Sequence, residues 1–368
     1  MKFTIAILPG DGIGPEIMSQ AIEVLNAIQT ISDHEFMYSY ALVGASAIEA
    51  QEHPLPSKTV QTCLEADVVL LGAVGDPKYD NAPIRPEQGL LALRKQLGLF
   101  ANIRPVKAYD NLKDLSPLKP TIIDSVDIQI FRELSSGIYF GKQERHADYA
   151  VDHCYYNKSE IERVTHLAFQ AARNRSKKVT LVDKANVLET SRLWREVVKK
   201  VHQDYLDIEL NFMYVDNAVM QIIQAPKQFD VILTSNMFGD ILSDGASVIT
   251  GTLGMLPSAS IGEQNALFEP VHGSYPQASK KDIANPIAMI LSTAMMLEYL
   301  GLAEEAAMIY TAVNHTVNER VGTEDMSPEI SLSCSRLGNL IASLISDDCE
   351  EMAGFNKLNI AGSIGTII

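Results

Sequence analysis

The sequence predicts an α/β protein in which a large sheet is covered by helices on both faces. Short apolar runs rich in β-branched residues alternate with helical patterns, and they occupy residues 3–8, 66–75, 179–183 and 229–235. Near-continuous apolar strands of this kind are typical of sheets buried on both sides, and their alternation with helices indicates the α/β class. At 368 residues the chain exceeds the ~100–200 residues usual for one domain, so two lobes are expected.

The composition disfavours several classes of protein. Hydrophobic residues make up 46% of the chain and charged residues 21%, which is ordinary for a globular enzyme and argues against disorder. The formal net charge of −16 disfavours nucleic acid and anionic membrane surfaces as partners. The most apolar later stretch, residues 286–300, is too short to span a bilayer, so we expect a helix of the core or of a subunit interface.

The N-terminus and the cysteines indicate a cytoplasmic protein. The first residues form a short apolar strand that ends in a glycine turn, without the apolar core and cleavage site of a signal peptide. The cysteines are scattered without a CxxC motif or a metal-ligand spacing, at Cys63, Cys154, Cys334 and Cys349. Reduced thiols in the cytosol are the simplest interpretation.

The glycine-rich segment 10–16 follows the first expected strand. Its glycines, Gly10, Gly12 and Gly14, do not match the GxGxxG spacing of a dinucleotide-binding loop. Pro15 suits the first turn of a helix, where its missing N–H costs nothing. The segment is therefore interpreted as a tight turn from strand to helix.

Polar residues follow two other expected strands, at 184–187 and 235–244. In open α/β sheets ligands bind beyond the carboxyl ends of strands, so a site is expected there. No low-complexity segment or Gly/Ser linker marks a domain boundary. If there are two lobes, we expect the chain to cross between them more than once.

Asp240 and Asp244 are candidate metal ligands. Helical residues four apart lie on one face with Cβ atoms about 5–6 Å apart, and two like charges there repel unless a cation lies between them. Ligands that are all oxygen favour Mg²⁺ or Mn²⁺ over zinc. Asp216 is a further carboxylate within an apolar run. A solvated helix face is the alternative, and the pattern alone leaves both open.

Four basic residues are candidates for acid–base chemistry or anion binding. Lys184 stands at a strand end, where it is either half of an ion pair or, if desolvated near cations, a usable general base. Arg94, Arg104 and Arg132 lie among apolar residues, where an unpaired guanidinium is costly. A guanidinium fits a carboxylate, so each partner is either an anionic substrate or an acid of the same chain.

Taken together, these segments resemble the isocitrate and 3-isopropylmalate dehydrogenase family of β-decarboxylating dehydrogenases. The resemblance runs from residue 9 to about residue 342. The segments that carry it are PGDGIGPE (9–16), GAVGDPK (72–78), RPEQGLLALRKQLGLFANIRPV (85–106), RELSSGIYFG (132–141), LVDKANVLETSRLWREVV (181–198), MYVDNAVMQ (213–221), SNMFGDILSDGASVITGTLGMLPSAS (235–260), EPVHGS (269–274) and IANPIA (283–288). Such an ensemble is not expected by chance.

The resemblance implies a non-Rossmann α/β fold of two lobes, with a large mixed sheet in the first lobe. The cofactor-binding domain would comprise residues 1–98 plus 251–368, and the substrate and dimerisation domain residues 99–250. It also implies a homodimer whose active sites are shared between the two subunits.

The resemblance further implies a role for each site residue. Those implied to bind the substrate carboxylates are Arg94, Arg104 and Arg132. Those implied to bind Mg²⁺ or Mn²⁺ are Asp240, Asp244 and Asp216 of the partner subunit, the last of which also serves the substrate. Tyr139 and Lys184 of the partner subunit would form the acid–base pair. Those implied to bind NAD are Gly75, Glu87, Asn186, His272, Gly273, Ser274, Tyr275 and Asn285.

Substrate choice is expected to depend on the helix that ends in Arg94. By resemblance, Glu87, Leu90 and Leu91 face the group on C3 of the substrate, and Val187 of the partner subunit completes the pocket. Leucines suit an isopropyl group, because each buried carbon is worth about 0.8 kcal/mol, whereas a carboxylate there would lose hydration without a partner. The expected reaction is the oxidative decarboxylation of (2R,3S)-3-isopropylmalate to 2-oxo-isocaproate with reduction of NAD, in leucine biosynthesis.

Some residues depart from the family pattern. Members that use NAD usually carry Asp where this chain has Gln277, which can bind a ribose hydroxyl but does not repel a 2′-phosphate; NAD remains the expected coenzyme. RELSSG replaces the usual RELTGG, and His153 stands where Thr is usual. The tail 346–368 resembles nothing in the family, so docking on the body or on the dimer partner and disorder both remain open.

Two alternatives to the expected reaction remain. The first is a relative that acts on another C3-substituted malate, isocitrate, homoisocitrate or tartrate. The second is a catalytically silent member of the fold that serves as a regulatory or binding subunit.

Overall fold

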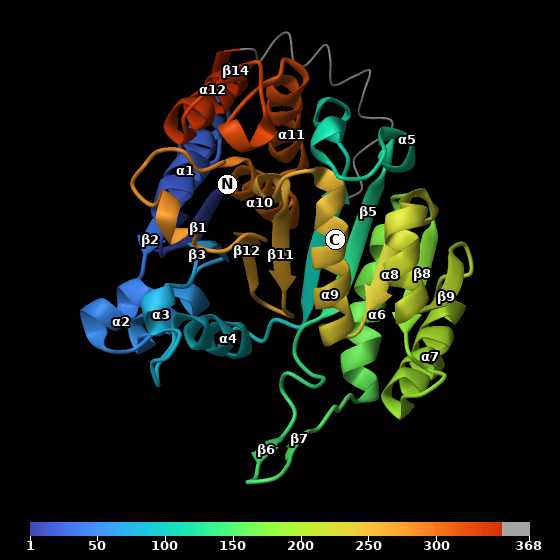
Figure 1. The fold of residues 1–368 in the computed structure, drawn as a ribbon. Coiled ribbons are helices and arrows are strands. Elements are labelled where there is room, and N and C mark those ends of the chain that lie inside the picture. The colour runs from blue at the N-terminus through green and yellow to red at the C-terminus, as the bar shows by residue number, and fades with distance from the viewer. Residues whose placement is uncertain (348–368) are drawn as a thin grey trace.

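A ten-stranded mixed sheet forms the centre of the computed structural model, which describes residues 1–347 (Figure 1). The segment 348–368, with Cys349 and nearly all of the tail discussed above, lies outside the described residues. In order across the sheet, the strands are β2 (Glu35–Tyr40), β1 (Lys2–Gly10), β3 (Val68–Ala73), β12 (Ala266–Pro270), β11 (Pro257–Ile261), β4 (Ala101–Lys107), β5 (Asp127–Glu133), β10 (Val231–Thr234), β8 (Lys178–Asp183) and β9 (Glu209–Tyr214).

Strand direction divides this sheet into two parallel halves. Strands β2, β1, β3 and β12 run parallel to one another, as do β5, β10, β8 and β9. Between them, β11 is antiparallel to both β12 and β4, and β4 is antiparallel to β5. The two halves therefore point in opposite directions, with their carboxyl ends at opposite edges of the sheet. This is a mixed, non-Rossmann sheet, as expected.

The sheet is shared between the two expected domains. Strands β1, β2, β3, β11 and β12 come from residues 1–98 plus 251–368, and the other five come from residues 99–250. The expectation that the sheet lies in the first lobe is wrong on this point. Because β4 pairs directly with β11 and with β5, the hydrogen-bonded ladder continues from one segment into the other.

Within residues 1–347, twelve α-helices surround the sheet. They are α1 (Gly14–Ile31), α2 (Ala45–Gln51), α3 (Ser57–Glu65), α4 (Pro86–Gln96), α5 (Pro120–Ile123), α6 (Lys158–Arg173), α7 (Glu189–Val201), α8 (Val215–Gln224), α9 (Asn236–Ser247), α10 (Ile287–Tyr299), α11 (Ala303–Asn318) and α12 (Cys334–Asp347). All residues of β3 and of β10 are buried, so both faces of the sheet are covered, as the apolar runs indicated.

Two short ribbons complete the described part of the chain. β6 (Gln143–Arg145) and β7 (Ala150–Asp152) form an antiparallel hairpin that projects from the body as an arm (Figure 1). β13 (Val321–Gly322) pairs with β14 (Ile330–Ser331). Helix α10 is buried all round, from Ile287 to Glu298, which confirms the expected core helix. Within residues 1–347, every helix is too short or too polar to cross a bilayer.

Candidate active site

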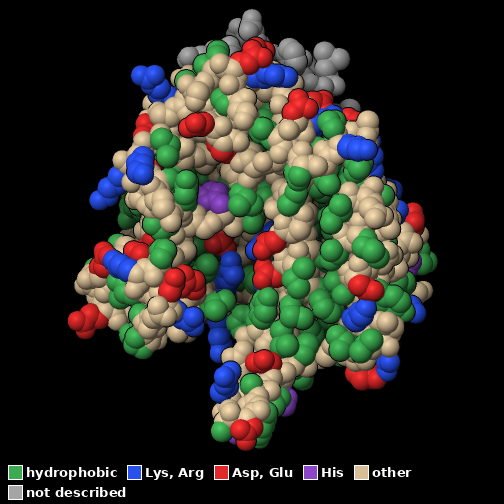
Figure 2. Space-filling model, in the orientation of Figure 1, with side chains coloured by type: hydrophobic (Ala, Val, Ile, Leu, Met, Phe, Trp, Pro, Cys, Tyr) green, Lys and Arg blue, Asp and Glu red, His purple; other side chains and the backbone are tan. Residues whose placement is uncertain are grey.

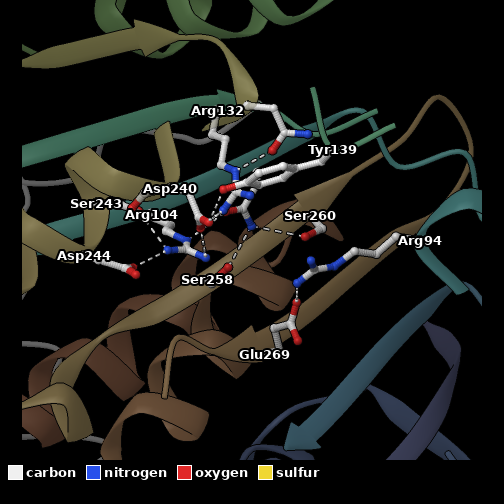
Figure 3. Close-up of polar contacts among 12 residues, drawn as sticks. Arg94, Arg104, Arg132, Tyr139, Asp240, Ser243, Asp244, Ser258, Ser260 and Glu269 are labelled. Atoms are coloured by element: carbon white, nitrogen blue, oxygen red, sulfur yellow. Dashed lines mark hydrogen bonds and ion pairs between the residues drawn. The ribbon is translucent and has the colours of Figure 1, made fainter. Parts of the chain in front are cut away.

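A cluster of polar side chains lies on one face of the sheet at its antiparallel centre (Figure 3). Residues two apart on a strand share a face, and so do residues opposite each other on paired strands. Asn102 and Arg104 therefore share a face of β4, and Asn102 lies opposite both Arg132 on β5 and Ser260 on β11. Ser258, two residues before Ser260, lies opposite Glu269 on β12. The antiparallel insertion thus brings residues that are distant in the sequence onto one surface.

Helix α9 packs against β4 and β5 and carries two carboxylates to this cluster. Arg132 Nη1 contacts Asp240 Oδ1, and Arg104 Nη1 lies 2.9 Å from Asp244 Oδ1. Arg94 reaches the cluster from α4, with its Nη2 2.6 Å from Glu269 Oε1. In the isolated chain each of the three arginines is thus paired with an acid of the same chain. Two of those acids are the expected metal ligands.

Because these guanidinium groups are largely buried, each needs an anionic partner to offset its lost hydration. The Arg132 side chain is only 6% exposed. Burial, together with the smaller effects of the Arg104 and Arg94 charges and against the opposing effect of Asp240, lowers the pKa of Arg132 to about 10. Three cations in so small a region need compensating negative charge. A bound polycarboxylate would supply that charge if the acids of α9 were engaged by a metal ion.

Tyr139 lies beside Asp240, in the segment that follows β5. Its hydroxyl donates to Asp240 Oδ2 at 3.1 Å, and its ring lies 5.9 Å from the Arg132 guanidinium carbon. Partial burial and the neighbouring Asp240 charge raise the pKa of Tyr139, so the hydroxyl keeps its proton. The side chain is nevertheless 44% exposed, which leaves it accessible to a substrate.

Lys184 and Asp216 form a separate pair. Lys184 follows β8, Asp216 lies in the first turn of α8, and Nζ is 2.6 Å from Oδ1 of Asp216. The salt bridge to Lys184 lowers the pKa of Asp216. In the sheet, β8 is separated from β4, which carries Arg104, by β10 and by β5, which carries Arg132. Within the described residues, no hydrogen bond or ion pair joins the Lys184–Asp216 pair to the Tyr139–Asp240 pair.

The carboxylates can serve a hard divalent cation, but only as an incomplete set within one chain. Asp240 and Asp244 lie one turn apart on α9 and offer only oxygen donors, which suits Mg²⁺ or Mn²⁺. Within residues 1–347, no group of three or more His, Cys, Asp or Glu side chains is arranged to hold a metal. The donors present fit such an ion if a third carboxylate comes from a second copy of the chain.

The leucines of α4 border an open depression. Leu91 is 47% exposed, whereas Leu90 is half-buried against the core. A pocket of about 350 Å³ is lined by Asp80, Arg85, Glu87, Gln88 and Leu91. In the same view as Figure 1, Lys and Arg side chains line a hollow between the α2–α4 region and α9 (Figure 2).

Val187, expected to complete the leucine pocket, does not join it within one chain. It lies in the turn between β8 and α7, where its backbone N–H donates to the Lys184 carbonyl oxygen at 3.0 Å. Helices α7 and α4 lie on opposite sides of the molecule in Figure 1. Asn186, expected at the coenzyme, is exposed in the same turn.

Several of the residues expected to bind the coenzyme lie close together, although they come from separate segments of the chain. A Cβ added at Gly75 would lie 3.1 Å from Glu87 Oε1 and 3.5 Å from Ser274 Oγ, so these three residues are neighbours. His272 Nε2 is buried without a hydrogen-bond partner within the described residues, as a site for an absent polar group would be. Gly273 and Tyr275 are exposed. This segment fits a polar ligand such as a dinucleotide.

Asn285 is engaged in a different way. Its Nδ2 donates to Asp325 Oδ2 at 3.1 Å and its Oδ1 accepts from the backbone N–H of Ile287 at 3.0 Å. Asn285 therefore anchors the start of α10 in the isolated chain.

Asp11 is a residue of this region that the sequence did not single out. Its carboxylate accepts from the backbone N–H groups of Ala45, Ser46 and Gly75 at 2.8–2.9 Å. The turn itself is as tight as expected, because Gly12 has a φ of +58° and a Cβ there would meet the Ser274 carbonyl oxygen at 2.0 Å. The glycine turn thus positions both the 72–75 and the 272–275 segments. The sequence feature that could have identified Asp11 is its position between two glycines, Gly10 and Gly12.

The fold and this cluster define an α/β enzyme in which guanidinium groups of the sheet and α4 meet the carboxylates of α9 and β12. The chain belongs to the isocitrate/isopropylmalate dehydrogenase family, whose model matches residues 4–341.

Relatives and solved structures agree with this family. The chain is 54% identical over 336 residues to the 3-isopropylmalate dehydrogenase of Geobacillus kaustophilus, covering 89% of this chain and 91% of the relative. It is 53% identical over 337 residues to that of Bacillus subtilis, covering 89% and 92%. The crystal structure of isocitrate dehydrogenase from Methylococcus capsulatus superposes with a TM-score of 0.84 at 33% identity, covering 94% of this chain and all of the other.

Proposed function

We propose that this enzyme catalyses the oxidative decarboxylation of 3-isopropylmalate to 2-oxo-isocaproate, with NAD as oxidant and Mg²⁺ or Mn²⁺ as metal, in leucine biosynthesis in the cytoplasm. The observation that carries the proposal is the cluster of Arg94, Arg104 and Arg132 beside the acids of α9. Relatives about half identical over most of the chain bear the name 3-isopropylmalate dehydrogenase.

The substrate's charges and shape match what this chain offers. Two carboxylates of a malate can replace the acids that hold the arginines in the isolated chain, since guanidinium binds carboxylate in a bidentate way. The exposed face of Leu91 and the half-buried Leu90 offer an apolar wall for the C3 substituent. A third carboxylate, as in isocitrate, would lose hydration against these leucines.

The metal ion and NAD would supply chemistry that the side chains of the protein cannot supply. The cation would supply Lewis-acid chemistry that acidifies the C2 hydroxyl and offsets the charge developed on decarboxylation, and NAD would supply the hydride acceptor for C2. Asp240 and Asp244, with Asp216 of the partner subunit, are the residues that would hold the cation. The segment around Gly75, His272 and Ser274 would hold the coenzyme.

Two side chains of the protein handle the protons. Lys184 of the partner subunit accepts the proton of the C2 hydroxyl, directly or through a water. After carbon dioxide has left, Tyr139 donates its proton to C3. The raised pKa of Tyr139 suits this role, because the hydroxyl arrives at that step still protonated.

A homodimer with shared active sites is part of this proposal. Within the described residues, Lys184 and Asp216 make no hydrogen bond or ion pair with Tyr139 or Asp240, and we infer that a second copy brings the two pairs together. Helix α8 exposes Val219, Met220 and Ile223, and Ile241 of the adjacent α9 is 53% exposed. Hydrophobic side chains gather over this region (Figure 2). Such a contiguous apolar surface is typical of a subunit interface. The division into a domain of residues 1–98 plus 251–368 and one of 99–250 is part of the same proposal.

The test is Mg²⁺-dependent NADH formation across a panel of C3-substituted malates, with isocitrate and tartrate included. We expect kcat/KM to be highest for 3-isopropylmalate and to fall by about fourfold for each carbon removed from the substituent. A preference for isocitrate, homoisocitrate or tartrate would replace this substrate by the alternative. Absence of NADH formation with every 2-hydroxy acid would favour a catalytically silent subunit.

A further inference from the structure

Two of the three arginines in the active-site cluster are held by buried asparagines in the same way. Arg104 Nε donates to Asn102 Oδ1 at 2.9 Å, and Arg132 Nε donates to Asn236 Oδ1 at 2.9 Å. Asn102 is 1% exposed and Asn236 is 0% exposed. In both arginines Nε thus donates a hydrogen bond to an amide oxygen, while the terminal Nη atoms point to the acids of α9.

The asparagines are themselves fixed by further hydrogen bonds. Asn102 Nδ2 donates to Ser258 Oγ at 2.9 Å and to Ser260 Oγ at 3.1 Å, and it lies 3.2 Å from the carbonyl oxygen of Ala259. These partners all belong to β11. Asn102 therefore ties the orientation of Arg104 to the neighbouring strand of the sheet.

Asn236 joins three segments around Arg132. Its Nδ2 donates to the Ser136 carbonyl oxygen at 3.0 Å, and its backbone N–H donates to the Tyr156 hydroxyl at 2.9 Å. Because Ser136 lies three residues before Tyr139, one amide connects β5, the start of α9 and the segment that carries the proposed proton donor. Arg94 differs, since its Nε is buried without a partner within residues 1–347.

We propose that Asn102 and Asn236 are positioning residues that fix the planes of the Arg104 and Arg132 guanidinium groups so that their terminal nitrogens receive the substrate carboxylates. A guanidinium carries five N–H donors in one plane, and engaging Nε leaves rotation about the remaining bonds without a favourable alternative. An amide oxygen achieves this without negative charge, so it does not compete with the substrate for the arginine. The identity of the anion in this proposal rests on the proposed function. The hydrogen bonds between the asparagines and the arginines do not depend on it.

Kinetics of a double-mutant cycle provide the first test. In Asn102→Ala we expect KM for 3-isopropylmalate to rise about tenfold with kcat changed less than about threefold, since misplacement of a clamp by a fraction of an ångström weakens binding. Arg104→Lys keeps the charge but has no Nε–H. Adding Asn102→Ala to Arg104→Lys should therefore raise KM by less than about twofold. Losses that multiply fully in the double mutant would overturn the proposal, because Asn102 would then act independently of Arg104.

The same cycle applies to Asn236→Ala with Arg132→Lys, and it has a matched control. Asn111 Nδ2 donates to the Val317 and Asn318 carbonyl oxygens, and no hydrogen bond joins Asn111 to an arginine within the described residues. Asn111→Ala should leave KM unchanged. An equal rise in KM in Asn111→Ala and Asn102→Ala would indicate a general loss of stability instead of lost positioning.

A spectroscopic readout separates this proposal from the proposed function. In protein labelled with ¹⁵N-arginine, the Arg104 Nε–H signal, assigned by its loss in Arg104→Lys, should be protected from exchange with water. We expect Asn102→Ala to abolish that protection and Asn102→Asp to retain it, because a carboxylate oxygen can replace the amide oxygen. Unchanged protection in Asn102→Ala would refute the positioning role. An enzyme inactive on all malates would refute the function and leave this measurement intact.

Discussion

Gly239 on α9 lies directly against Arg132 on β5. A Cβ built on Gly239 would lie 2.7 Å from both Cβ and Cγ of Arg132, closer than real side chains approach. The absence of a side chain at this position therefore lets α9 approach the sheet closely enough for Asp240 to reach Arg132. The spacing between helix and strand is part of the active-site geometry.

Gly239→Ala is expected to lower kcat/KM by about 10- to 100-fold, because the added methyl group displaces either α9 or the Arg132 side chain. It should also destabilise the protein by about 1–3 kcal/mol, as overpacking in a core does. Gly245 on the same helix provides the control, since a Cβ there meets nothing within 4 Å. Gly245→Ala should leave turnover unchanged and raise stability by about 0.5–1 kcal/mol. Similar kinetics for the two variants would contradict the close-approach explanation.

Lys184→Ala and Tyr139→Phe are each expected to lower kcat by about 10²–10⁴. Because Lys184 and Tyr139 belong to separate clusters within one chain, mixed dimers of the two variants should regain activity. Random pairing of equal amounts gives half heterodimers with one intact site each, or about a quarter of wild-type turnover. The measurement requires co-expression with two tags, and co-expressed chains that both carry Tyr139→Phe should regain nothing. Failure of the mixed dimer to recover would contradict shared sites.

Leu91→Ala tests the apolar wall. We expect KM for 3-isopropylmalate to rise about 10-fold through lost burial of the side-chain carbons, with little change for malate lacking a C3 substituent. Lys95, one turn later on the exposed side of α4, provides a control position, and Lys95→Ala should affect neither substrate. Equal effects of Leu91→Ala on both malates would place the C3 group elsewhere.

Coenzyme preference is expected to depend on the turn at 275–278. Gln277 is exposed and carries no charge that would repel a 2′-phosphate. We expect kcat/KM to favour NAD in the wild type, and Gln277→Asp to raise the ratio of NAD to NADP efficiency by about tenfold or more through like-charge repulsion. A wild-type preference for NADP would refute NAD as the coenzyme.

Glu298 on α10 predicts a pH dependence of stability that is unrelated to catalysis. Burial raises the pKa of Glu298 to about 8, although the Tyr310 hydroxyl partly opposes the shift, and Oε2 has no hydrogen-bond partner within residues 1–347. The folded protein holds this proton more tightly than the unfolded chain does. The stabilisation is therefore complete below the ordinary glutamate pKa of about 4.5 and is lost as pH rises towards 8.

Glu298→Gln should remove this pH dependence. We expect the variant to be more stable than the wild type by about 1–3 kcal/mol at pH 8 and close to it at pH 5, as measured by urea unfolding. If the free energies of unfolding of the two proteins change in parallel between pH 5 and pH 8, Glu298 does not titrate in that range.

Several features could be predicted from local sequence. Apolar runs at 3–8, 66–75, 179–183 and 229–235 correspond to β1, β3, β8 and β10, and the stretch 286–300 corresponds to α10. These segments are buried on all sides, so their composition reports their environment directly. The glycine turn and the helical spacing of Asp240 and Asp244 were also predictable, because both depend on residues a few positions apart.

The central antiparallel strands were not predictable in this way. β4, β11 and β12 carry the polar residues Asn102, Ser258 and Glu269 on buried positions. Their polar side chains satisfy one another only after the sheet has formed. The sequence rule that places ligands beyond the carboxyl ends of strands also describes only part of the site. The two parallel halves point in opposite directions, so the arginines meet on the face of the sheet.

The sequence by itself determined the family, the α/β class and the residue types that carry charge, since these follow from motifs and local patterns. Only the tertiary structure decided which charges meet. It paired each arginine with an acid of the same chain, oriented Arg104 and Arg132 through buried asparagines, and paired Lys184 with Asp216 and Tyr139 with Asp240. Several of these relationships, such as the contacts of Asp240 with Arg132 and Tyr139, join residues more than 100 positions apart. They depend on strand order and register, and neither composition nor periodicity encodes distances across a sheet.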